Sequence, residues 1–204
     1  SLMKSLERLP GVNAFGIGAG QSKPVIRGLS FNRVAIVENG IKHEGQQWGS
    51  DHGLEVDQYS IDQVEVIKGP TSMMYGSDAI GGVIMLDQTN VPEPNSWGGL
   101  VDLSARTNND LLGGSFGLYA RADKLYARLR TTYLDYGDYK VPVDSVDIYS
   151  YRAPLYKNHL RNTAGKEGAL HLEIGYIHNG FSNRLFISLL KNKIGFFANA
   201  HGQE

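Results

Sequence analysis

The sequence predicts an α+β fold in two parts: a small mixed sheet with short helices, followed by an antiparallel all-β segment. Up to about residue 90, short β-rich runs are broken by Gly-Pro and Gly-Gly pairs, as in short strands around one modest core. The run from Pro92 to Ser96 is typical of a linker. Beyond it, apolar and polar residues alternate with the period of strands that have one apolar face. These observations place the two parts at residues 1–91 and 98–204.

The first part is predicted to begin with a helix, because Leu2, Leu6 and Leu9 recur at helical spacing and Pro10-Gly11 ends the run. Runs of β-branched and apolar residues predict strands in the rest of this part. The expected elements are strands over Lys23–Ile26, Arg33–Val37, Val64–Ile67 and Val83–Leu86, and one helical turn over Thr71–Tyr75.

Two stretches of the first part are expected to be loops. The stretch from Val12 to Gln21 carries Gly16, Gly18 and Gly20. A run of this kind cradles phosphate when it lies between a strand and a helix, but here it leads into a strand, so a flexible loop is favoured over nucleotide binding. The stretch from Lys42 to Gln58 is polar and aperiodic, and a loop of that length in a compact unit is more often functional than idle.

The second part is predicted to contain about five antiparallel strands. Alternation begins near Val101 and runs through two turns, Asn108 to Asp110 and Asp123-Lys124, to about Tyr133. Two further strands are expected at about 169–178 and 184–197, after one long Tyr-rich loop over 135–165. Strands with one apolar side suit the wall of a transmembrane barrel, and they also suit a soluble sheet with one wet face.

Composition excludes several classes of function. The chain has 204 residues, a formal net charge of -1 and no Cys, so disulfides and thiolate chemistry are excluded and nucleic acid is not an expected partner. No apolar run reaches the roughly 18 residues of a membrane helix. No catalytic constellation or cofactor motif is present, so neither an enzyme nor a cofactor is expected. Because Ser1 opens directly on the predicted helix, we expect that any targeting segment lay upstream.

Several motifs of the first part follow one another over about residues 1–90. They are Leu9-Pro10-Gly11-Val12, Ile26-Arg27-Gly28, Val37-Glu38-Asn39-Gly40, and the runs from Ile61 to Pro70, from Ser72 to Ser77 and from Ala79 to Ile84. In this order they resemble the plug signature of TonB-dependent outer-membrane receptors. For the second part, the resemblance favours a transmembrane barrel wall over a soluble sheet, and this part is then expected to be the first strands of a transmembrane β-barrel.

The resemblance implies a transporter in the outer membrane of a Gram-negative cell. In the family, the plug blocks the lumen of a barrel of about 22 strands, so five strands form an incomplete, truncated barrel. The implied partners are the TonB energy-transducing protein, outer-membrane lipid and a small-molecule or metal ligand. The box that contacts TonB is expected to be absent from this chain.

Two cations are implied to be contacts between plug and barrel. In relatives, arginines at the positions of Arg27 and Lys68 pair with barrel carboxylates. Lysine at position 68 keeps the charge but lacks the planar, two-pronged donor of arginine. The alternative is that both are solvated surface cations.

The polar stretch after Ile41 is the candidate ligand-facing loop. Its candidate residues are His43, Glu44, Gln47, Trp48, Asp51 and His52. Imidazole and carboxylate groups are ligands for zinc and other borderline metals, so His43, Asp51 and His52 form a candidate metal site. An Asp- and His-rich plug loop is also similar to that of zinc-type receptors, and the alternative is a polar loop at the plug apex.

The function expected from these observations is energy-coupled uptake of a scarce nutrient, with the plug gating the barrel. An iron chelate, haem, cobalamin, a metal ion and a glycan all remain candidates. The alternative is a secreted or surface β-rich structural or adhesive protein with no transport role, which would not need the ordered Gly-Pro and Gly-Gly motifs.

Overall fold

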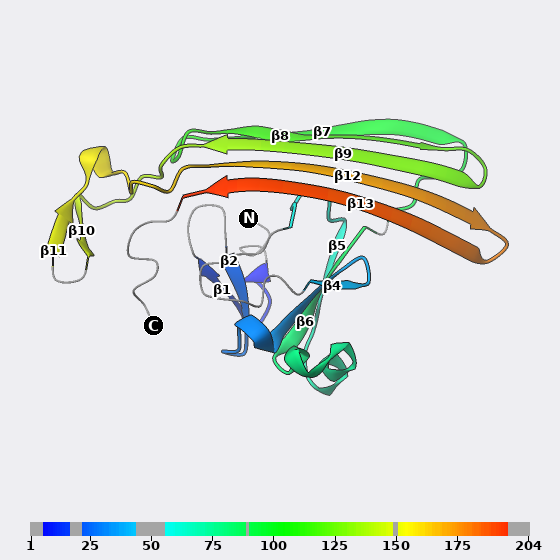
Figure 1. Cartoon of the computed structure of the whole chain (residues 1–204), viewed down its shortest axis with the longest axis horizontal. Helices are drawn as coiled ribbons and strands as arrows, with labels where there is room; N and C mark the ends of the chain where they lie inside the picture. Colours follow the sequence, from blue (N-terminus) through cyan, green and yellow to red (C-terminus); the bar gives the residue numbers. More distant parts are fainter. Residues whose placement is uncertain (1–5, 17–21, 44–55, 89, 149–150, 196–204) are drawn as a thin grey trace. The chain divides into compact units, whose positions relative to one another are not determined.

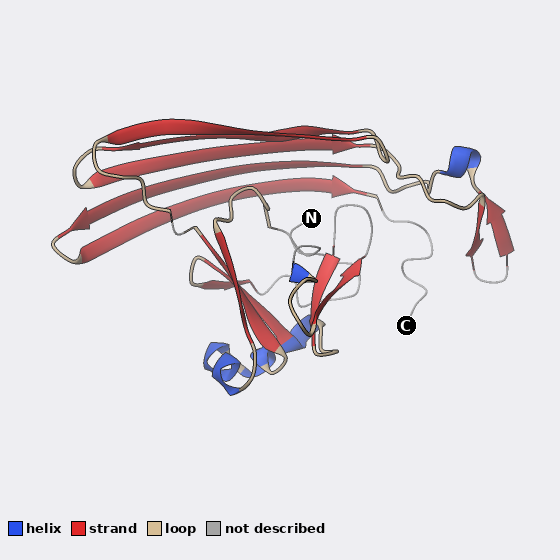
Figure 2. Ribbon diagram, turned by 180° about the vertical axis from the view of Figure 1, so that it is seen from behind, coloured by secondary structure: helices blue, strands red, loops and turns tan. Residues whose placement is uncertain are grey.

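The computed structural model of the chain describes residues 6–16, 22–43, 56–88, 90–148 and 151–195. Its backbone divides into two compact units, residues 1–89 with 143–155 and 196–204, and residues 90–142 with 156–195. Strands are the main regular structure of both units (Figures 1 and 2). In the described part of the chain, no helix is long and apolar enough to cross a membrane.

The α+β class is only loosely supported, because the described fold is mostly β. Apart from Leu6, the helical residues in the described ranges form short 3-10 helices: η1 (Phe31–Arg33), η2 (Pro70–Tyr75), η3 (Ser77–Ala79) and η4 (Tyr156–Asn158). Of the helix predicted over Leu2–Leu9, residues 1–5 lie outside the described residues, Leu6 is helical and residues 7–8 form a turn. Glycines at positive φ on both sides of η2, Gly69 and Gly76, keep that segment to six residues.

The main sheet of the first unit is mixed, as predicted. Its four strands lie in the order β4 (Ile41–His43), β3 (Val34–Glu38), β6 (Gly82–Asp87), β5 (Gln63–Ile67). The two central strands, β3 and β6, are parallel, with Val34 opposite Gly82, and the outer pairs are antiparallel. A parallel central pair buried on both faces explains why β3 and β6 are nearly continuous apolar runs.

The prediction of a loop from Val12 onward is wrong for its first five residues. Val12–Gly16 forms strand β1, which pairs antiparallel with β2 (Ser22–Ile26) in a second, two-stranded sheet. Val12 is almost fully buried, and that burial outweighs the loop preference of the glycines that follow. Gly18 and Gly20 lie outside the described residues.

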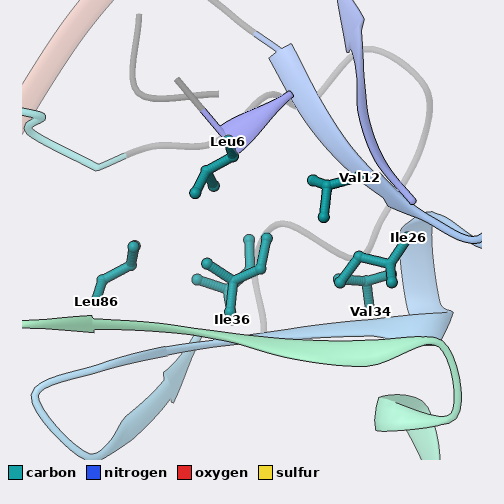
Figure 3. Packing of buried hydrophobic residues seen from close by; sticks show 7 residues of the cluster. Leu6, Val12, Ile26, Val34, Ile36 and Leu86 are labelled. Atoms are coloured by element: carbon teal, nitrogen blue, oxygen red, sulfur yellow. The ribbon is translucent and has the colours of Figure 1, made fainter. Parts of the chain in front are cut away.

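Two apolar clusters hold the first unit together. The larger contains Leu6, Val12, Ile26, Val34, Ile36, Ile84 and Leu86 (Figure 3). The smaller contains Ala35, Val37, Ala79 and Val83. Successive residues of β3 alternate between the two clusters, so the sheet carries apolar contacts on both faces.

The Gly81-Gly82 pair permits the close approach of β6 to its neighbours. A Cβ at Gly81 would lie 2.6 Å from the carbonyl oxygen of Arg33, to which the Gly81 amide donates at 2.7 Å. Gly82 has a φ of +142°. Glycine fits the close approach at position 81 and the positive φ at position 82, so the predicted turn is also the point where β6 enters the core.

The second unit is one antiparallel sheet of five strands, in agreement with the predicted number. The order is β13 (Phe181–Ile194), β12 (Gly165–His178), β9 (Leu125–Tyr136), β8 (Leu111–Arg121), β7 (Ser96–Arg106). Consecutive strands pair along nearly their full length. Within the described residues, β7 and β13 are the edge strands of this sheet.

The alternation in sequence separates the second unit into an apolar face and a polar face. Across the pairing registers, the exposed residues that share the apolar face are Trp97, Val101, Leu103, Leu112, Phe116, Leu118, Leu125, Leu129, Tyr133, Leu170, Ile174, Tyr176, Phe181, Leu185, Ile187 and Leu189. The polar face carries Asp102, Ser115, Arg128, Arg130, Thr132, Glu167, His171, Glu173, Arg184 and Ser188. So large an exposed apolar surface is unusual for a protein face in water.

The long loop predicted over 135–165 is wrong in part, because it contains structure. β9 extends to Tyr136, and β10 (Ser145–Ile148) and β11 (Tyr151–Pro154) form a hairpin. The base of the connection is closed by Asp138, whose Oδ1 accepts from the amides of Thr163 at 2.7 Å and Ala164 at 2.9 Å. Hydrogen bonds of this kind leave no periodic pattern of apolar residues, so the sequence pattern does not predict them.

Truncating the centre of the larger cluster tests this core. We expect Ile84→Ala to lower the free energy of unfolding of the first unit by about 2–5 kcal/mol, because Ile84 is fully buried and the cavity would not collapse completely. Met74→Ala is the control, since Met74 is 83% exposed, and it should change stability by less than about 0.5 kcal/mol. Chemical denaturation measures both, and equal effects would contradict the assignment of the core.

Candidate functional site

The β3–β4 hairpin positions the only predicted ligand-facing residue that lies in the described part of the chain. Asn39 and Gly40 form its turn with φ of 49° and 81°, the conformation that Asn-Gly favours. Asn39 also accepts from the Gln88 amide at 2.9 Å and donates its own amide to the Leu86 carbonyl at 2.9 Å. The hairpin is therefore anchored to β6 and its extension.

His43 ends β4 and lies within hydrogen-bond distance of a carboxylate there. Its Nε2 lies 2.7 Å from Oε2 of Glu38, and both side chains are partly buried. Beside it, Lys42 pairs with Asp78 of η3. A metal at His43 would therefore bind through Nδ1 or displace Glu38 from Nε2.

The rest of the predicted ligand-facing loop lies outside the described residues. This applies to Glu44, Gln47, Trp48, Asp51 and His52. Within the described ranges, no group of three or more His, Cys, Asp or Glu residues is close enough to hold a metal ion. The site formed by His43, Asp51 and His52 remains a prediction.

Arg27 and Lys68, the two predicted contacts between plug and barrel, both reach the Pro10-Gly11 turn. Lys68 Nζ donates to the Pro10 carbonyl at 2.5 Å, and the Arg27 amide donates to the Gly11 carbonyl at 2.8 Å. Arg27 follows β2, has a backbone φ of 51° and is exposed. Sequence reasoning missed that a lysine at position 68 ties the end of β5 to the chain before β1.

A buried carboxylate with two hydrogen-bond donors lies on the polar face of the five-stranded sheet. Glu173 on β12 accepts from Tyr126 Oη at 2.6 Å and from Arg128 Nη1 at 3.3 Å. Its side chain is 2% exposed. Tyr126 reaches it by lying across Gly175, where a Cβ would overlap the tyrosine ring. The glycine therefore leaves the space that positions the donor to Glu173.

The same arrangement recurs at the other end of β12. Tyr136 lies across Gly165, where a Cβ would come within 2.7 Å of Tyr136 Oη, and this hydroxyl donates to Glu167 at 2.8 Å. We call these the two Tyr-Gly-Glu clamps. Sequence analysis missed them. The available pattern is a Gly and a Glu two residues apart at both ends of one strand, as Gly165 with Glu167 and, in reverse order, Glu173 with Gly175.

A row of polar contacts crosses the sheet between the clamps. Arg130 pairs with Asp102 and donates from Nε to Ser115 Oγ at 2.7 Å. Thr132 Oγ1 donates to the same Ser115 oxygen at 3.0 Å. Farther along, His171 Nδ1 lies 2.9 Å from Ser188 Oγ. The polar face thus holds its charges in fixed, hydrogen-bonded positions, which suits a surface that is hydrated or packed against other polar groups.

Changing a clamp glycine tests its role. We expect Gly175→Ala to destabilise the second unit by about 1–3 kcal/mol, because its Cβ overlaps the Tyr126 ring. The penalty should fall below about 1 kcal/mol in a Tyr126→Ala background, which removes the ring. Gly168→Ala on the same strand is the control, since its Cβ would meet no atom closer than 3.9 Å. An unchanged Gly175→Ala penalty in the Tyr126→Ala background would contradict the clamp.

Known proteins match both units. The family model described as TonB-dependent Receptor Plug Domain matches residues 1–83. The "Vitamin B12 transporter BtuB" of Photobacterium profundum is 35% identical over 85 residues, which cover 41% of this chain and 14% of that protein. The "Iron-regulated outer membrane virulence protein" of Vibrio cholerae serotype O1 is 32% identical over 117 residues, which cover 54% of this chain and 18% of that protein.

A solved structure extends the likeness beyond the plug motifs. The structure titled "Copper transporter OprC" superposes with a TM-score of 0.74 over 95% of this chain and 28% of its own, at 18% sequence identity. At that identity the likeness concerns the fold alone. The chain spans less than a third of the length of each of these three proteins.

Proposed function

Because this chain belongs to the TonB-dependent receptors through its plug domain, we propose that it is part of an outer-membrane transporter that takes up a scarce nutrient by energy-coupled transport. The observation that carries the proposal is the plug match over residues 1–83 in a chain whose second unit is a sheet with one apolar and one polar face. The plug domain spans residues 1–91 and gates a barrel, to which residues 98–204 contribute the first strands.

The division of the sheet into two faces supports the role as barrel wall. Membrane strands of β-barrels alternate between apolar residues toward lipid and polar residues toward the lumen. In this assignment the apolar face of the second unit contacts outer-membrane lipid, and the clamps and Arg130 lie on the lumen side. Its outer edges at β7 and β13 pair with other strands of the barrel, because unpaired backbone groups are too costly in lipid.

The substrate belongs to the classes that such receptors take up: an iron chelate, haem, cobalamin, a metal ion or a glycan. The proteins and structures that resemble this chain include ones named for vitamin B12, iron, haem and copper, which supports the breadth of this set. The loop that begins at His43 faces the ligand. The protein is a transporter and not an enzyme.

TonB is the proposed energy-transducing partner. Arg27 and Lys68 are proposed contacts of the plug with barrel carboxylates, and the exposure of Arg27 supports its part in this role. The Lys68 bond to Pro10 would then be exchanged for, or shared with, a barrel acceptor. Nucleic acid is not a proposed partner.

Uptake in cells tests the transport role. Cells that lack the receptor containing this chain should lose uptake of one labelled substrate among a ferric chelate, haem, cobalamin, copper and zinc, and cells that lack TonB should lose the same uptake. Restoring the gene should restore uptake only when TonB is present. A surface-exposed protein whose deletion changes cell adhesion but no uptake would favour the structural or adhesive alternative.

Metal capture by the ligand-facing loop has a separate test. If His43, Asp51 and His52 bind zinc, calorimetric titration of the whole receptor should show a site that a His43→Ala/His52→Ala variant loses, because each imidazole supplies one bond of about 2.0–2.1 Å. A His159→Ala/His178→Ala variant removes two imidazoles from the second unit instead, and it should retain the site. Equal zinc affinity in all three proteins would remove the metal proposal.

A further inference from the structure

The apolar face of the second unit ends in a group of lysines at one end only. On β12 the residues of this face run from Leu170 through Gly168 to Lys166, and on β13 they run from Leu189 to Lys191 and Lys193. Lys166 lies directly opposite Lys193, and Lys191 lies opposite Gly168. The three side chains therefore share one corner of the apolar face, which we call the lysine corner.

The lysine corner carries excess positive charge. Lys166 forms an ion pair with Asp135 at 2.7 Å and remains 62% exposed. Lys191 and Lys193 are exposed, and no ion pair engages either of them among the described residues. Three lysines and one aspartate leave a net charge of two positive units (3 - 1) beside an apolar surface.

The opposite end of the apolar face has a different composition. There the face ends in Trp97, Leu125, Tyr176 and Phe181, close to the short turns that join β8 to β9 and β12 to β13. None of the described strands places a lysine or arginine on the apolar face at that end. Trp97, Tyr176 and Phe181 are aromatic, and aromatic residues at the end of an apolar face mark the level where hydrocarbon meets the headgroups. The positive charge is thus confined to the end from which the long connection leaves.

We propose that the lysine corner binds the phosphate groups of a phosphorylated membrane lipid whose acyl chains lie on the adjacent apolar face. Three chemical features support this ligand. Lysine stems cover apolar surface while their ammonium groups reach the headgroup level. An ammonium group is a mobile point charge with three donors and adapts to phosphate oxygens. The neighbouring residues toward the sheet centre, Leu170 and Leu189, are apolar and exposed, so one lipid can contact both surfaces. This inference rests on the proposed barrel wall.

The direct test measures lipid binding to the whole receptor. The probe is bis-phosphorylated lipid A in detergent solution, compared with the same lipid after removal of its phosphates. Substituting all three lysines by glutamine (Lys166→Gln, Lys191→Gln and Lys193→Gln) should weaken binding of the phosphorylated probe at least about tenfold, because each basic residue near an anionic lipid surface contributes severalfold. Binding of the dephosphorylated probe should be weak in both proteins and unchanged by the substitutions.

A matched control and an opposite variant sharpen the result. Lys124→Gln, Lys140→Gln and Lys157→Gln together remove the same charge from positions outside the strands of the sheet, and this variant should bind lipid A as the original protein does. Asp135→Asn releases Lys166 from its partner and should tighten binding. Inorganic phosphate at millimolar concentration should not compete, since it lacks the acyl chains.

The outcomes separate this inference from the proposed function. Heat-dependent gel mobility and membrane fractionation report whether each variant forms an inserted barrel. If the receptor inserts but lipid A binding is the same in the lysine-corner and control variants, or inorganic phosphate competes as well as lipid, the inference is wrong and the barrel proposal stands. If the receptor does not insert, the proposed function itself fails.

Discussion

Pairing register is the constraint on which the second unit depends. Side chains alternate between faces with a period of two, so a slip of one residue between two strands would move every apolar residue of one strand to the polar face. The register of β12 against β9 is specified by features other than the alternation. Each Tyr-Gly-Glu clamp fits only when the tyrosine lies opposite its glycine, as Tyr126 does with Gly175 and Tyr136 with Gly165.

The clamps make the hydrogen bonding of a buried charge depend on the pairing register. A carboxylate as buried as Glu173 is costly unless it accepts strong hydrogen bonds, and Tyr126 and Arg128 supply them. A slip would remove the donors and leave the charge buried. The same pairing therefore keeps the apolar face continuous, and on that face it brings the lysines at the ends of β12 and β13 into one corner.

The first unit depends on a different constraint, the close approach of β6 to β3. Gly81 and Gly82 permit that approach, and the parallel pair then carries an apolar cluster on each face. On this base the Asn39-Gly40 turn is anchored through Leu86 and Gln88, so the proposed ligand-facing loop begins from an anchored hairpin. A loop on an anchored support can vary in sequence without loss of the fold, which suits the different nutrients, vitamin B12 and copper, for which similar proteins are named.

The sequence by itself determined the features that repeat along the chain. Period-two alternation identified the five strands of the second unit, and the ordered Gly-Pro and Gly-Gly motifs indicated the plug, because both are local patterns of residue type. The tertiary structure alone decided β1, the β10–β11 hairpin and the short 3-10 character of the helices. It also decided the partners of particular side chains: Lys68 with Pro10, His43 with Glu38, and the tyrosines with their glycines. These pairings join residues on different strands or turns, and they follow from register and packing, which no local pattern contains.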